Sequence, residues 1–86
     1  LTADDVGELI NTTAGVTVPS GQFSAGDAVT IYNGTTSDII ITQGTSVTMY
    51  LAGSSTTGDR TLAQKGVATV LCVGTDTFTI LGGGLS

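Results

Sequence analysis

The sequence has no histidine, no tryptophan, and only one cysteine and one proline among its 86 residues. Without histidine, the chain lacks the most common general base and the ligand on which many zinc and copper sites depend. A lone cysteine excludes an internal disulfide, and Cys72 lies in an apolar run where we expect a small buried side chain. We therefore expect no catalytic residue, no cofactor, no metal site and no enzyme activity.

Charged residues are also scarce, at 10% of the chain, and seven acids outnumber Arg60 and Lys65 to give a net charge of −5. Two cations cannot neutralise a nucleic-acid backbone or hold an anionic membrane surface. No apolar run approaches the roughly 18 residues that a membrane span needs. We therefore expect neither nucleic acid nor membrane among the partners.

The length predicts one domain, residues 1–86. A domain of this size buries only about 60–65% of the surface of its unfolded chain, so oligomerisation or a longer parent chain would help to stabilise it. The sequence begins without methionine and without a signal-peptide pattern, and we interpret it as a fragment of a longer protein. The glycine-rich residues 82–86 are expected to form a flexible end.

Threonine, serine, glycine and β-branched residues make up most of the chain, and apolar runs recur about every ten residues between turn residues. This spacing predicts an all-β fold, a small antiparallel β-sandwich or barrel-like domain of short strands. Its clearest element is the stretch 28–42, where Asn33-Gly34 separates two β-rich runs. Asn-Gly favours the type I′ turn of a β-hairpin.

Further strands are predicted after this hairpin. Residues 47–51 alternate between apolar and polar, and residues 61–63 begin a return strand that a turn at 64–66 ends. Residues 67–73 are nearly all apolar, which predicts a central strand covered on both faces. A hairpin loop at 74–76 then pairs this strand with residues 77–81.

Toward the N-terminus, Thr2 is predicted to cap a single helical turn that Gly7 ends in a left-handed conformation. Phe23 is expected to close one end of the core. The remaining acids of interest, Asp27, Asp38, Asp59 and Asp76, lie in predicted turns, where aspartate usually accepts hydrogen bonds from its own turn.

The best candidate for contact with a partner is the polar loop after residue 51. Its candidate residues are Tyr50, Ser54, Ser55, Thr56, Thr57, Asp59 and Arg60. Loop tips of this composition vary readily and carry binding functions. Tyr50 and Tyr32 would form a carbohydrate-stacking patch if they shared an exposed face; otherwise each is an aromatic in a cross-strand pair.

Several segments together resemble one family. They are LTADDVGELI at 1–10, VTVPS at 16–20, FSAGD at 23–27, IYN at 31–33, ITQG at 41–44, LAG at 51–53, TLAQKG at 61–66 and VATVLCV at 67–73. In this order they resemble a small β domain of tailed-bacteriophage structural proteins, found in tail fibres, head fibres and capsid-decorating proteins. Glu8 departs from the pattern, which has a basic residue at that position.

The resemblance implies a virion component on the surface of a capsid or tail, commonly trimeric and without enzyme activity. Its implied partners are copies of itself and other virion proteins, such as the major capsid protein or tail components. The alternative within the same family is the receptor-binding tip of a tail fibre, whose partner would be a host surface glycan.

Overall fold

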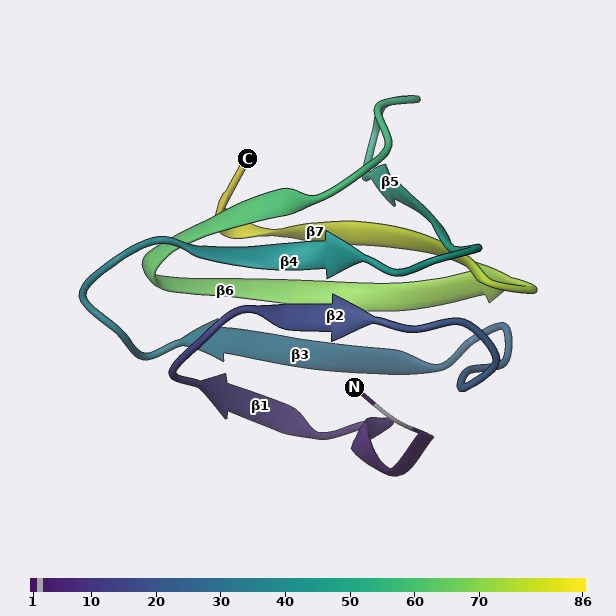
Figure 1. Ribbon diagram of the computed structural model, residues 1–86, viewed down its shortest axis with the longest axis horizontal. Coiled ribbons are helices and arrows are strands. Elements are labelled where there is room, and N and C mark those ends of the chain that lie inside the picture. Colours follow the sequence, from purple (N-terminus) through teal and green to yellow (C-terminus); the bar gives the residue numbers. More distant parts are fainter. Residues whose placement is uncertain (2) are drawn as a thin grey trace.

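The strands of this molecule pair mainly with partners that are distant in the sequence. The computed structural model describes residue 1 and residues 3–86, and within these it has seven strands and one short 3-10 helix, η1 (Ala3–Asp5) (Figure 1). The strands are β1 (Leu9–Thr12), β2 (Val16–Val18), β3 (Ala28–Asn33), β4 (Ile39–Gln43), β5 (Thr48–Leu51), β6 (Arg60–Gly74) and β7 (Thr77–Leu85). The predicted all-β class is confirmed.

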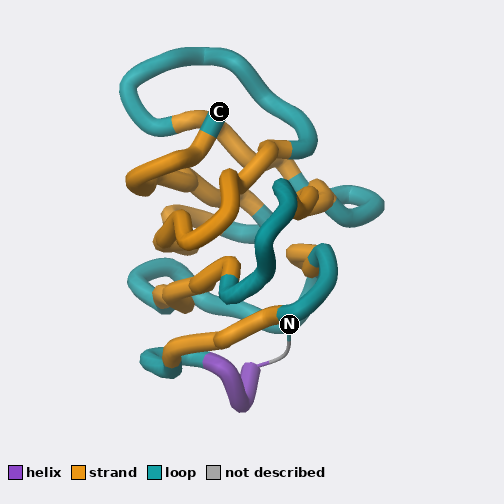
Figure 2. Tube along the Cα trace, turned by 90° about the vertical axis from the view of Figure 1, so that its left-hand side faces the viewer, coloured by secondary structure: helices purple, strands orange, loops and turns teal. Residues whose placement is uncertain are grey.

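The strands form one mixed sheet that curls into a half-barrel with two walls. The back wall consists of β1, β3, the second part of β6, β7 and β5, in this order. The front wall consists of the first part of β6, β4 and β2. In Figure 1 the front wall lies nearer the viewer, and Figure 2 views the half-barrel along its strands. The hydrophobic core lies between the walls.

Three strand pairs are parallel, namely β1 with β3, β2 with β4, and β5 with β7. The predicted antiparallel arrangement therefore holds only for the pairs that β6 makes with β3, β4 and β7. For the pairs of β1 with β3 and of β2 with β4, the reason is that the first four strands alternate between the walls. A strand that returns to a wall after crossing to the other wall runs in its earlier direction, so it pairs in parallel.

The predicted hairpin at Asn33-Gly34 is wrong. β3 and β4 do not pair with each other but with different parts of β6. Neither Asn33 nor Gly34 adopts the positive φ that a type I′ turn requires. The Asn33 side chain is instead fully buried and donates hydrogen bonds to the carbonyls of Leu62 and Ala63, which are far away in the sequence.

β6 reverses its direction where the sequence predicts a turn, at residues 64–66 (Figure 1). Lys65 has a φ of 58°, and the register with β7 shifts between Leu62 and Val67. The two parts of β6 therefore belong to different walls. At the other end of β6, the predicted hairpin with β7 is confirmed, with Asp76 at a φ of 49° in its turn.

Residues 82–85 continue β7 and do not form the flexible end that the glycine run predicts. Gly82 pairs with Ala68, Gly83 with Val67, and Leu85 with Leu62. Glycine is needed here because the two strands approach closely: a Cβ at Gly82 would lie 2.0 Å from the carbonyl oxygen of Val67. Gly82 thus serves the close packing of the curled sheet.

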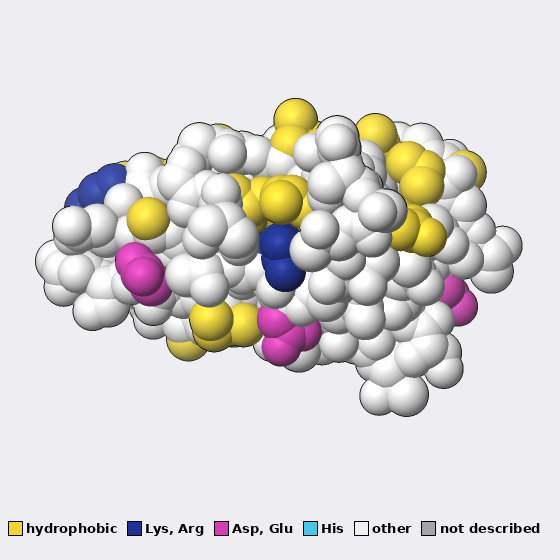
Figure 3. All heavy atoms as spheres, turned by 90° about the horizontal axis from the view of Figure 1, so that it is seen from above, with side chains coloured by type: hydrophobic (Ala, Val, Ile, Leu, Met, Phe, Trp, Pro, Cys, Tyr) yellow, Lys and Arg dark blue, Asp and Glu magenta, His cyan; other side chains and the backbone are white. Residues whose placement is uncertain are grey.

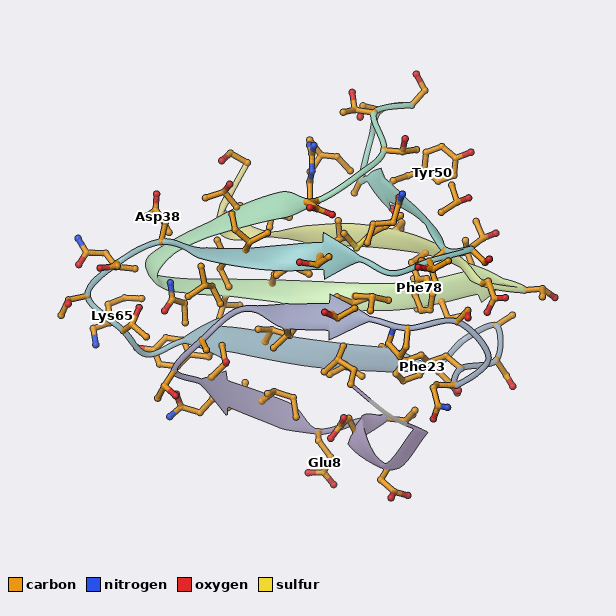
Figure 4. All side chains as sticks on the ribbon, viewed as in Figure 1. Glu8, Phe23, Asp38, Tyr50, Lys65 and Phe78 are labelled. Atoms are coloured by element: carbon orange, nitrogen blue, oxygen red, sulfur yellow. The ribbon has the colours of Figure 1, made fainter. Side chains whose placement is uncertain are left out.

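One cluster of buried side chains fills the space between the walls. Its members are Val18, Val29, Ile31, Ile39, Ile41, Val47, Met49, Leu62, Ala68, Val70, Cys72, Phe78 and Ile80. Phe23 packs edge-on against Phe78, with 5.7 Å between ring centroids, so the prediction that it closes one end of the core is confirmed (Figure 4). The buried position of Cys72 is also confirmed.

The second part of β6 is central, as predicted, but it is covered on one face only. Ala68, Val70 and Cys72 point into the core, whereas Val67 and Val73 are exposed. The apolar run alone does not reveal this, because the front wall covers only the inner face of the sheet.

Of the predicted N-terminal turn, Gly7 has the expected φ of 77°, and the cap at Thr2 lies outside the described residues.

The close approach at Gly82 yields a test with a matched control. Gly82→Ala is expected to lower the free energy of unfolding by about 1–3 kcal/mol, since its Cβ meets backbone that cannot move aside easily. Gly83→Ala adds the same group one residue later, where no atom lies within 4 Å, and should leave stability nearly unchanged. Urea unfolding of both variants measures the difference, and equal stabilities would contradict the packing described here.

Candidate functional site

The predicted partner-binding loop, residues 52–59, leaves β5 and returns to the start of β6 (Figure 1). It is exposed along most of its length. Tyr50 lies on β5 beside the loop and forms an isolated antiparallel bridge with Thr57 (Figure 4). The structure thus brings Tyr50 and the loop hydroxyls together, as the sequence predicts.

Gln43, at the end of β4, fixes the base of this loop. Its Oε1 accepts hydrogen bonds from the backbone N–H groups of Met49 at 2.8 Å and Gly58 at 3.1 Å. Its own backbone N–H donates to Oδ1 of Asp59 at 2.8 Å. Gln43 therefore connects the end of β4 with β5, which precedes the loop, and with Gly58 and Asp59, where the loop ends.

The tip of the loop is a tight turn held by its own backbone. The N–H of Leu51 donates to the carbonyl of Thr56, and the N–H of Ser54 donates to the carbonyl of Leu51. The hydroxyl of Ser54 also donates to Leu51 and accepts from the N–H of Thr56. Gly53 and Gly58 supply the positive φ angles, 82° and 110°, that this path requires.

The candidate residues therefore divide into two groups. Ser54, Asp59 and Arg60 take part in the loop's own structure; the Nε of Arg60 donates to the backbone carbonyl of Asp59 at 2.7 Å. The side chains that face solvent are Tyr50, Ser55, Thr56 and Thr57. Binding by this loop would depend on one aromatic ring and three small polar side chains.

Tyr32 and Tyr50 share the outer face of the back wall but are not close. β6 and β7 lie between their strands, which places β3 and β5 about 14 Å apart at the usual strand spacing, and the two residues are also offset by four positions along β6. Tyr32 is paired with Asn11 and Val67, and Tyr50 with Thr79. The two rings are thus members of separate cross-strand pairs and form no common stacking patch.

Two of the turn aspartates bind distant segments. Asp27 accepts a hydrogen bond from the N–H of Ser24, three residues earlier, as predicted for a turn. Asp76 accepts one from the N–H of Gly21 at 2.7 Å, and Asp59 accepts from Gln43. Asp38 is exposed in the loop between β3 and β4 (Figure 4).

All seven acids lie outside the strands. On the face seen in Figure 3, charged side chains cover little of the surface. Among the described residues, no three potential metal-binding side chains gather at one place, and no pocket is present. No helix in this part of the chain has the length and hydrophobicity to cross a membrane.

The sequence analysis missed a second candidate surface, the outer side of the back wall. Val67, Val73 and Leu81 point outward there with 42, 51 and 46% of their surface exposed, and Leu9 is 62% exposed. We call these residues, together with the half-buried Leu71 on the same side of β6, the outer apolar face. The alternating positions of 67–73 contain this signal, but the nearly continuous apolar run hides it.

Comparison with known proteins identifies no relative: no family model, no curated protein and no solved structure matches the chain.

The role of Gln43 can be tested directly. Gln43→Ala removes the acceptor shared by Met49 and Gly58, and should raise the hydrogen-exchange rates of these two amides while lowering stability by about 1–3 kcal/mol. Gln64→Ala alters an exposed glutamine in the β6 reversal and serves as the control. Unchanged exchange at Met49 and Gly58 would refute the assignment.

Proposed function

We propose that this chain is a structural module of a bacteriophage virion, on the surface of a capsid or tail, that assembles as a homotrimer. In this role it is not an enzyme and carries no cofactor. Its partners are copies of itself and other virion proteins, such as the major capsid protein or tail components. The resemblance of its sequence segments to small β domains of phage structural proteins supports this proposal.

The observation that carries the proposal is the outer apolar face. An 86-residue domain has a small core, and here several large apolar side chains remain outside it on one uncharged sheet surface. Burial of such a surface between subunits supplies stability that the core of a small domain does not provide. The same composition, rich in threonine and poor in charge, suits a subunit in a fixed assembly.

A second candidate function is the receptor-binding tip of a tail fibre that recognises a host surface glycan. The observation in its favour is the exposed ring of Tyr50 beside the hydroxyls of Ser55, Thr56 and Thr57, on a loop held in one shape by Gln43. An exposed aromatic with adjacent hydroxyls offers a sugar both an apolar face and hydrogen-bonding groups.

The virion role predicts that the protein is a constituent of particles. Mass spectrometry of density-purified particles of a phage that encodes this sequence should detect its peptides in constant proportion to the major capsid protein. The particle-free lysate is the control. Its presence only in the particle-free fraction would contradict the proposed function.

The glycan-binding alternative predicts that Tyr50→Ala weakens binding to a glycan array about tenfold or more, since the ring supplies the stacking surface. Tyr32→Ala, on the same sheet face but away from the loop, should bind like the parent chain. The alternative fails if the parent chain binds no glycan, or if both tyrosine variants bind equally well.

A further inference from the structure

The outward-facing positions of the back wall carry no charge. The seven acids lie outside the strands, Lys65 lies at the β6 reversal, and Arg60 starts β6 in the front wall. The apolar side chains of this face are Leu9, Tyr50, Val67, Leu71, Val73 and Leu81. A chain with a net charge of −5 thus has one broad surface that is electrically neutral.

The apolar side chains are concentrated along the middle of this face. β6 lies between β3 and β7, and three of its four outward residues, Val67, Leu71 and Val73, are apolar, whereas the fourth, Thr69, is polar. Threonines flank it on both sides, for example Thr30 on β3 and Thr79 on β7. An apolar centre with a polar surround is the usual composition of a subunit interface.

We propose that the outer apolar face is the surface through which copies of this chain assemble, with β6 of each copy turned toward a three-fold axis. The proposal rests on the trimer of the proposed function and identifies the residues that form it. Three sheets that face a common axis place their middle strands nearest to it. Val67, Leu71 and Val73 of the copies would then meet at the centre, and Leu9 and Leu81 would lie at the flanks.

The dimensions of the molecule agree with such an interface. Its two longest dimensions are 33 and 28 Å, which limit the projected area of the broad side to about 900 Å², comparable with the roughly 800 Å² that a standard interface buries on each partner. The front wall is smaller, because it consists only of β2, β4 and the short first part of β6.

The distribution of charge favours another copy over a partner of opposite charge. A basic protein would be drawn to the acids, which lie in the turns and in η1, and not to the back wall. A neutral face, by contrast, lets two chains of the same charge approach while their acids stay in solvent. Because the acids still repel one another at longer range, association should strengthen as salt screens them.

The test compares the mass of the 86-residue chain with that of surface variants across a concentration series, by light scattering after size exclusion. The parent chain should be a trimer of its 8.5 kDa chain. Val67→Lys with Leu81→Lys should raise the dissociation constant about tenfold or more, because the two charges would be buried. Ile40→Lys is the matched control, since Ile40 is 45% exposed on β4 of the front wall.

Circular dichroism and thermal unfolding establish that the variants are folded. Val73→Thr provides a milder, nearly isosteric change at a side chain that is 51% exposed. Val73→Thr should weaken the trimer in the same direction, and an increase from about 0.05 to 0.5 M NaCl should strengthen it. A monomeric parent chain would overturn the proposal, as would an oligomer that Ile40→Lys disrupts and the back-wall variants do not. A trimer formed by this face but absent from phage particles would refute the virion role alone.

Discussion

The buried side chain of Asn33 connects the parts of the fold that the sequence separates. Its Nδ2 donates to the carbonyls of Ser37, Leu62 and Ala63, at 2.8, 3.0 and 3.1 Å. Its Oδ1 accepts from both the N–H and the hydroxyl of Thr35. Because each buried carbonyl left without a donor costs about 1–3 kcal/mol, this one amide holds β3, the following loop and the β6 reversal in a fixed relation.

The β6 reversal in turn decides the shape of the sheet. The Nζ of Lys65 donates to the carbonyl of Gly34, which fixes the reversal to the loop after Asn33 from the solvent side. Gly66 is needed there because a Cβ would lie 2.8 Å from the carbonyl oxygen of Ala63. Since β6 pairs with β3, β4 and β7, its change of direction moves β4 and β2 in front of the back wall and closes one side of the core.

Local patterns in the sequence predict what is local in the structure. The alternation at 47–51, the β6–β7 hairpin, Phe23 at the end of the core and the buried Cys72 all follow from neighbouring residues. The hairpin at Asn33-Gly34 fails because the Asn33 side chain binds carbonyls about thirty residues away, as its separations from Leu62 and Ala63 show. The candidate loop was recognisable from its composition, but its support by Gln43 depends on a contact across fifteen residues.

The sequence analysis missed the outer apolar face for a related reason, which concerns the whole fold. An apolar run does not indicate how many of its faces the chain itself can cover. Here the first four strands alternate between the walls, and the short front wall covers the inner face of the back wall only. Another covering layer would have to come from outside these 86 residues. Because consecutive strands alternate between the walls and do not pair with each other, Val67, Val73 and Leu81 remain on the surface. The proposed assembly therefore places other copies of the chain there.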